Sequence, residues 1–158
     1  MRNKIIRNKI FKFILYIIIP LGLGTIVGFL SGSNQGYTEI NKPFFAPSGI
    51  VFPIVWSILY IIMGISAYKI SESSSAYRNI ALNSYYTQLF VNLLWSFIFF
   101  KLKMLLLAAL WIILLIYLVI KMIINFNKID KISSYLQIPY LIWLVFAFIL
   151  NITIYFIN

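Results

Sequence analysis

The sequence predicts an all-helical integral membrane protein, built as a single bundle of five transmembrane helices. Its 158 residues are 63% hydrophobic and 10% charged, which is more apolar side chain than the interior of a soluble domain of this size can hide. The apolar residues fall into five runs of about 20 residues, the length of helix that crosses a bilayer core about 30 Å thick. The connections between the runs are short, so we expect residues 1–158 to form one domain.

The five runs predict helices at residues 13–32, 48–68, 79–100, 104–124 and 135–157. A basic segment before the first run is also typical of a signal peptide, but this run is longer than a signal-peptide core and no Ala-x-Ala cleavage site ends it. We therefore expect it to remain as a helix. Gly24, Gly28 and Gly32 recur in it at every fourth residue. Such a stripe of small residues suits close packing against another helix of the chain or, as the alternative, a dimer seam.

Residues 33–47 form the longest polar connection and are long enough to fold over the bundle as a lid. The lid leads into the second helix through Pro47 and Pro53, which lack an amide hydrogen and suit a loop or a first helical turn. Beyond them Trp56 and Tyr60 stand four residues apart and share one helix face. This stretch predicts a stiff entry into an aromatic helix face that forms one wall of a binding site.

The third predicted helix carries polar side chains within the membrane. Gln88, Asn92 and Trp95 stand at positions i, i+4 and i+7 and share one face. Amide groups are costly in hydrocarbon unless they are hydrogen-bonded, so this face is expected to point into the bundle. The sequence leaves two roles open for these amides, hydrogen bonds between helices and direct contacts to a ligand.

The fifth predicted helix has a similar face. Tyr140, Trp143, Ala147 and Asn151 stand at positions i, i+3, i+7 and i+11. Pro139 precedes them by one residue, about a turn inside the predicted start. A proline there is expected to kink the helix or to set its true beginning.

The net charge of +10 comes from basic residues at the ends of the apolar runs. Positions of this kind are typical of topology signals and of contacts to lipid headgroups, so we expect membrane lipid and no nucleic acid as a partner. Ten of the thirteen basic residues fall on the side of the N-terminus and three on the other side. The positive-inside rule therefore predicts that the N-terminus lies inside.

Several kinds of chemistry are excluded by composition. The chain has no cysteine and no histidine, which removes disulfides, Cys/His zinc sites and the usual axial ligand of haem iron. Its three acidic residues are too few for a carboxylate metal cage. No acid/base pair and no nucleophile with a neighbouring base can be identified. We expect no required cofactor, and a binding protein rather than an enzyme.

Three motifs resemble those of the TspO/MBR family, the translocator proteins, also called tryptophan-rich sensory proteins or peripheral-type benzodiazepine receptors. The first motif matches at Lys42, Pro43, Pro47, Val51, Phe52, Pro53, Val55, Trp56, Leu59, Tyr60, Met63 and Gly64. The second matches at Gln88, Leu89, Asn92, Trp95, Ser96, Phe99 and Phe100, and the third at Pro139, Tyr140, Trp143, Phe146, Ala147, Leu150 and Asn151. Two loop positions depart from the pattern, since Phe45 replaces the usual tryptophan and Ser48 the second proline of a pair.

The resemblance implies a five-helix bundle in a membrane, expected here to be a bacterial cell membrane, and often a homodimer. It also implies a pocket below the first loop that binds porphyrins such as protoporphyrin IX, or other flat hydrophobic molecules including drugs. The pocket residues implied by position are Trp56, Tyr60, Asn92, Trp95, Trp143 and Ala147, with Phe45 and Pro47 as lid contacts and Trp111 as a weaker candidate.

The residues themselves suit this ligand class. Trp56, Trp95 and Trp143 offer faces for stacking on a flat macrocycle, and polar groups such as that of Tyr140 offer hydrogen bonds that orient it. Without a histidine the site suits a metal-free porphyrin. The expected function is that of a porphyrin-binding membrane receptor or sensor. The alternatives are light- and oxygen-dependent degradation of porphyrin, and passive transport of tetrapyrrole or lipid-like ligands.

Overall fold

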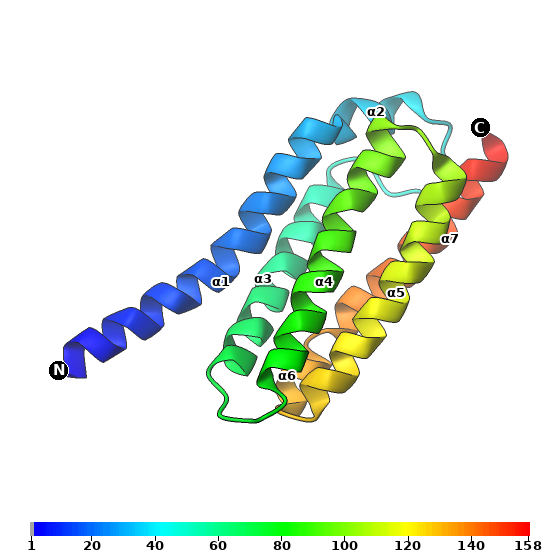
Figure 1. The fold of residues 1–158 in the computed structure, drawn as a ribbon. Coiled ribbons are helices and arrows are strands. Elements are labelled where there is room, and N and C mark those ends of the chain that lie inside the picture. The colour runs from blue at the N-terminus through cyan, green and yellow to red at the C-terminus, as the bar shows by residue number, and fades with distance from the viewer. Residues whose placement is uncertain (1) are drawn as a thin grey trace.

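The computed structural model describes residues 2–158, and it describes side chains from Ile5 onward. Within this part of the chain every regular element is a helix. The elements are α1 Arg2–Ser31, α2 Ser33–Glu39, α3 Val51–Ser71, α4 Arg78–Ser96, the π-helical turn η1 Phe97–Lys101, α5 Leu105–Asn127, α6 Lys131–Tyr135 and α7 Ile138–Ile157. Figure 1 shows the long helices side by side, with the N- and C-termini at opposite ends.

Four stretches of the described chain are long and apolar enough to cross a membrane. They are Ile5–Ser31, Val51–Ser71, Leu105–Asn127 and Lys131–Ile157. The third predicted helix, α4, has 19 residues but does not reach this standard, because amide and hydroxyl side chains dilute its apolar character. The fold is thus an all-helical membrane architecture. Four of its five predicted spans are long and apolar enough to cross a membrane.

The helix boundaries differ from those predicted at both ends of the chain. The first helix begins at Arg2 rather than residue 13, because lysine and arginine favour a helix almost as well as leucine and no glycine or proline interrupts residues 2–19. The last predicted helix, 135–157, begins three residues later as α7, and α6 forms in the predicted loop before it. Pro139 lies in the first turn of α7, so it sets the beginning of that helix as expected. The three middle helices agree with the prediction to within a few residues if η1 is counted with α4.

The predicted loop 33–47 is also partly helical, since α2 occupies its first half. The chain turns from α1 into α2 at Gly32, whose φ of 71° lies in the left-handed region that favours glycine. The third glycine of the predicted stripe therefore makes a turn rather than a helix contact. Figure 1 places α2 across one end of the bundle.

Helix α1 lies against α3 at two glycines. A Cβ atom at Gly64 would overlap the main-chain carbonyl of Tyr16, so only glycine lets the two backbones approach this closely. Pro20 lacks the amide hydrogen that would otherwise bond to this carbonyl. About one turn beyond Pro20, a Cβ at Gly24 would overlap the ring of Tyr60. Gly24 of the predicted stripe thus serves packing within the chain, one of the two roles that the sequence left open.

The end of the bundle opposite α2 is closed by ion pairs. Lys69 at the end of α3 lies 2.8 Å from the Asp130 carboxylate, which also caps α6 by accepting from the Ser133 amide at 2.9 Å. Burial by itself would raise the pKa of Asp130, but the hydrogen bonds from Lys69 and Ser133 outweigh it and lower the pKa to about 2. A second pair joins Lys12 of α1 to Glu72 at 2.7 Å.

Candidate ligand-binding cavity

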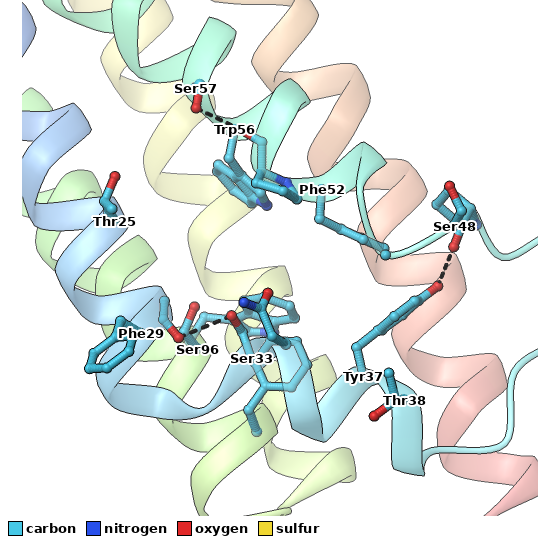
Figure 2. Close-up of a pocket in the computed structure, with 18 of the residues that line it drawn as sticks. Thr25, Phe29, Ser33, Tyr37, Thr38, Ser48, Phe52, Trp56, Ser57 and Ser96 are labelled. Carbon is cyan, nitrogen blue, oxygen red and sulfur yellow. Dashed lines mark hydrogen bonds between the residues drawn. The ribbon is translucent and has the colours of Figure 1, made fainter.

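A cavity of about 800 Å³ lies under α2 and the loop that follows it, between α1, the first turns of α3 and the end of α4. Much of its wall is aromatic, formed by Phe29, Tyr37, Phe52, Trp56, Tyr60, Trp95 and Phe100. Figure 2 shows Phe52 and Trp56 of α3 across the cavity from Ser33 and Tyr37 of α2. The volume falls within the roughly 300–1,000 Å³ typical of small-molecule sites.

The α3 wall follows from the spacing of its aromatic residues. Phe52, Trp56 and Tyr60 stand four residues apart, so all three point to the same side of the helix. Trp56 stacks on Tyr60 with ring centroids 5.6 Å apart, and Phe52 meets Tyr37 of α2 edge-on at 4.8 Å. These contacts hold the rings of the wall in fixed orientations.

The floor of the cavity is polar and fully hydrogen-bonded to a buried network. The Tyr60 hydroxyl donates to Asn92 Oδ1 at 2.8 Å, and Asn92 Nδ2 donates to the Tyr140 hydroxyl at 2.8 Å. Tyr140 donates onward to Gln88 Oε1 at 2.9 Å. Tyr60 and Asn92 reach the cavity, whereas Tyr140 and Gln88 lie behind it in the core. The amides of α4 therefore join three helices, and Asn92 also lines the cavity.

Trp95 brings the end of α4 to the cavity. Its indole nitrogen donates to Asn151 Oδ1 at 3.1 Å, and Asn151 Nδ2 donates to the Leu105 carbonyl at 3.1 Å. The ring stacks on Phe99 at 5.2 Å. The indole nitrogen of Trp95 is thus hydrogen-bonded to α7, so a ligand in the cavity would contact the face of the Trp95 ring.

Side-chain hydrogen bonds hold the cover of the cavity in place. The Tyr37 hydroxyl donates to the Pro47 carbonyl at 2.6 Å and so ties α2 to the start of α3. Burial raises the pKa of Tyr37, so this hydroxyl stays protonated at neutral pH. Lys42 Nζ donates to the carbonyls of Tyr37 and Ile40 at 2.9 and 3.0 Å, which satisfies the C-terminal end of α2. These bonds hold residues 33–47 over the cavity, and their role as a lid stays a prediction.

Five of the nine predicted site residues line the cavity: Pro47, Trp56, Tyr60, Asn92 and Trp95. Helical spacing predicted that Trp56 and Tyr60 share one face and that Asn92 and Trp95 share another. The resemblance to the TspO/MBR family implied that these faces and Pro47 line a pocket.

The other four predicted residues lie outside the lining. The Tyr140 hydroxyl is hydrogen-bonded within the network behind the floor, and the residue is only 1% exposed. Trp143 packs edge-on against Phe52 with ring centroids 5.9 Å apart, so Phe52 lies between Trp143 and the lid. The buried indole nitrogen of Trp143 has no hydrogen-bond partner. Ala147 is half-buried one turn further along α7, and Phe45 is on the surface against Phe44. Trp111, the weaker candidate, donates to the Val91 carbonyl at 2.8 Å in the core.

The sequence did not predict the part of the wall that α1 and α2 supply. Thr25, Gly28 and Phe29 of α1 and Tyr37 of α2 line the cavity. The glycine stripe was the only feature of α1 that the sequence singled out. It indicated close packing but did not identify the element or ligand that packs against α1. Tyr37 lies in a polar stretch with no periodicity that would single it out.

Comparison with known proteins agrees with this architecture. A profile of the TspO/MBR family matches residues 16–157. The chain is 34% identical to the tryptophan-rich protein TspO of Archaeoglobus fulgidus, over 95% of this chain and 99% of that protein. It is 33% identical to the tryptophan-rich protein TspO of Chlorobaculum tepidum, over 93% and 98%. It is 29% identical to the tryptophan-rich sensory protein of Cereibacter sphaeroides, over 91% and 90%. The chain therefore belongs to the TspO/MBR family and is an integral membrane protein.

Proposed function

We propose that the chain is a membrane receptor or sensor that binds a porphyrin, or another flat hydrophobic molecule of that size, in the cavity under α2. The observation that carries the proposal is the cavity itself, about 800 Å³ with aromatic walls and a hydrogen-bonded floor. A relative that carries the name tryptophan-rich sensory protein supports the sensor role.

The chemistry of the lining favours a metal-free macrocycle. Trp56 and Trp95 present ring faces, on which a flat aromatic ligand gains offset stacking as well as burial. The sequence has no histidine or cysteine to ligate haem iron. A protoporphyrin needs no such ligand, and drug-like aromatic molecules could occupy the same walls.

We also propose that α4 crosses the membrane as a fifth span, with the N-terminus inside. Two amide side chains in its interior, Gln88 and Asn92, are buried and hydrogen-bonded, so the hydrocarbon does not have to solvate them. Its outer face carries exposed apolar side chains such as Phe90, which is 62% exposed and suits contact with lipid. Five spans put the N-terminus, the α3–α4 loop and α6 on one side, where most of the basic residues lie.

The test is a titration of the purified protein in detergent micelles with protoporphyrin IX, followed by the Soret absorbance of the porphyrin. Trp56→Ala is expected to weaken binding roughly tenfold or more, because it removes a large stacking surface from the centre of the wall. Tyr117→Ala is the control, since this residue is 61% exposed on α5, away from the cavity. Equal affinities for the wild type and Trp56→Ala would show that porphyrin does not bind in this cavity.

A further inference from the structure

We infer that the cavity holds its ligand in one orientation, with acidic groups at Lys42 and an apolar or hydrogen-bond-donating edge at Tyr60. This inference rests on the proposed function and adds the direction in which the ligand lies. It depends on two features at opposite ends of the cavity, the polarity of the buried hydrogen-bond network and the position of one cation.

The direction of the network is set at its inner end by Met63. A thioether sulfur accepts hydrogen bonds and cannot donate them, so Gln88 turns its amino group to it, with Nε2 3.6 Å from Sδ. The Gln88 oxygen then accepts from the Tyr140 hydroxyl at 2.9 Å. The reversed amide would leave a buried oxygen against sulfur with no donor, which is unfavourable for a residue that is fully buried.

The same direction continues to the cavity floor. Tyr140 has given its single hydroxyl hydrogen to Gln88, so it accepts from Asn92 Nδ2. Asn92 therefore shows its oxygen to Tyr60, whose hydroxyl donates to it at 2.8 Å. Each of these three hydrogen bonds is therefore donated in the direction that leads away from the cavity. The Tyr60 oxygen keeps only lone pairs for a ligand, so the floor accepts hydrogen bonds at this oxygen and disfavours carbonyl or carboxylate groups next to it.

The opposite end of the cavity is cationic. Among the described residues that line it, Lys42 alone carries a charge. All three acidic residues of the chain pair with other lysines, so no carboxylate neutralises Lys42 in the described structure. Its ammonium group uses two of its three hydrogens on the carbonyls of Tyr37 and Ile40, which leaves one for an anion.

The two features are well separated along α3. Lys42 donates to the Tyr37 carbonyl, and the Tyr37 ring packs on Phe52 in the first turn of α3. Tyr60 lies eight residues beyond Phe52, which corresponds to about 12 Å of rise. Lys42 lies in the loop before that helix. A protoporphyrin carries its two propionates on one edge and apolar vinyl groups on the other. The cavity matches this arrangement when the propionates face the loop.

The cationic end is tested with protoporphyrin IX and its dimethyl ester, which lacks the negative charges. Lys42→Gln is expected to weaken the diacid roughly fivefold and to leave the diester within twofold, since a partly exposed ion pair contributes at most a factor of this size. Lys42→Arg should restore most of the loss. Lys101→Gln is the matched control, because it removes the same charge from an exposed lysine outside the cavity lining and should change neither ligand.

The floor is tested with two porphyrins that differ on the edge opposite the propionates, haematoporphyrin with hydroxyethyl groups and diformyl deuteroporphyrin with carbonyls. The wild type should prefer the hydroxyl-bearing ligand, and Tyr60→Phe should reduce that preference to near unity. Because the wild-type preference is itself a result, the test does not depend on how well the variant folds.

The outcomes separate this inference from the proposed function. If neither protoporphyrin IX nor its ester binds the wild type, the proposed function fails. If both bind but Lys42→Gln weakens them equally or not at all, the cationic end plays no part and the orientation is wrong. A wild-type preference for the diformyl ligand would overturn the accepting floor.

Discussion

The two ends of the bundle are built in different ways. At the end near α6, ion pairs such as Lys69–Asp130 join neighbouring helices and the interior is filled by side chains. At the end near α2 the helices enclose a cavity of about 800 Å³, and neutral hydrogen bonds such as that from Tyr37 to Pro47 hold its cover. The polar network of Asn92 and Tyr140 lies between the two ends.

This difference teaches how a small membrane protein keeps a cavity without losing its fold. Helix association depends on close packing and on buried hydrogen bonds, because lipid is as apolar as the helix surfaces. The solid end and the central network supply these contacts, so the other end can remain hollow. Substitutions should therefore affect stability at the solid end and in the network, and ligand binding at the hollow end.

The largest effect is expected where α1 and α3 cross. Gly64→Ala would place a methyl group against the main chain of α1, which cannot yield as a side chain would, so we expect a loss of about 3 kcal/mol or more in the free energy of unfolding. Gly28→Ala is the matched control at the hollow end, where the nearest atom to a Cβ is Ser33 Oγ at 3.6 Å. Thermal unfolding in one detergent should show a large fall in Tm for the first variant and none for the second.

The network is the next most sensitive region. Tyr140→Phe removes the hydroxyl that accepts from Asn92 and donates to Gln88, so both amides lose a partner. We expect a cost of about 1–3 kcal/mol, measured by thermal unfolding. Tyr155→Phe removes a hydroxyl from a 38% exposed residue of the same helix and should leave Tm unchanged. A similar Tm for both variants would show that the network contributes nothing to the difference between the ends.

A smaller effect is expected for the ion pair and cap of α6. Asp130→Asn should cost about 1 kcal/mol, mainly because the cap becomes weaker. The folded pKa of Asp130, about 2, lies below its ordinary 3.8. Its contribution is therefore complete above about pH 4 and is lost as the pH falls through about 2. Unfolding of the wild type and of Asp130→Asn from pH 6 to pH 2 should converge at the acid end.

The ion pair at the hollow end provides the comparison for Asp130. Lys103 and Glu39 lie 3.2 Å apart, but their side chains are 67% and 62% exposed. Glu39→Gln should therefore leave Tm unchanged at every pH. A fall equal to that of Asp130→Asn would contradict the view that the charges of the α6 end are the structural ones.

Only a small change in stability is expected at the cover of the cavity. Tyr37→Phe keeps the ring against Phe52 and removes only the hydrogen bond to Pro47, so we expect a cost of about 1 kcal/mol or less. The ligand should nevertheless dissociate faster, because α2 is then less firmly tied to α3. Stopped-flow displacement of bound porphyrin measures this rate, and an unchanged rate would show that ligand exchange does not depend on this bond.

The sequence predicted the faces of the long helices well. Trp56 and Tyr60 on α3 and Asn92 and Trp95 on α4 line the cavity because helical periodicity decides which residues share a face. The same periodicity correctly placed Tyr140 on a face that points into the bundle. A residue on such a face can, however, line a cavity or pack against another side chain. The distance between helices decides which, and no local pattern records that distance.

Other parts of the site had weak signals. Helix α2 has seven residues, and Gly32 before it makes no side-chain cap, so nothing in the sequence distinguished it from a loop. The early start of α1 was missed because the end of an apolar run was taken as the end of the helix. A basic helix can continue beyond the hydrocarbon, as α1 does.

The length of α1 has a consequence for how the protein sits in a bilayer. Its 30 residues span about 45 Å, which exceeds a hydrocarbon core of about 30 Å. Few of its side chains are held by the rest of the bundle, since only 6% of its apolar window is buried. Because α1 is fixed to α3 at Gly64, we expect the excess length to be met by tilt of the whole bundle and by basic turns that extend beyond the hydrocarbon. Because the same contacts hold the inner face of α1 as one wall of the cavity, we expect the cavity to keep its width in bilayers of different thickness.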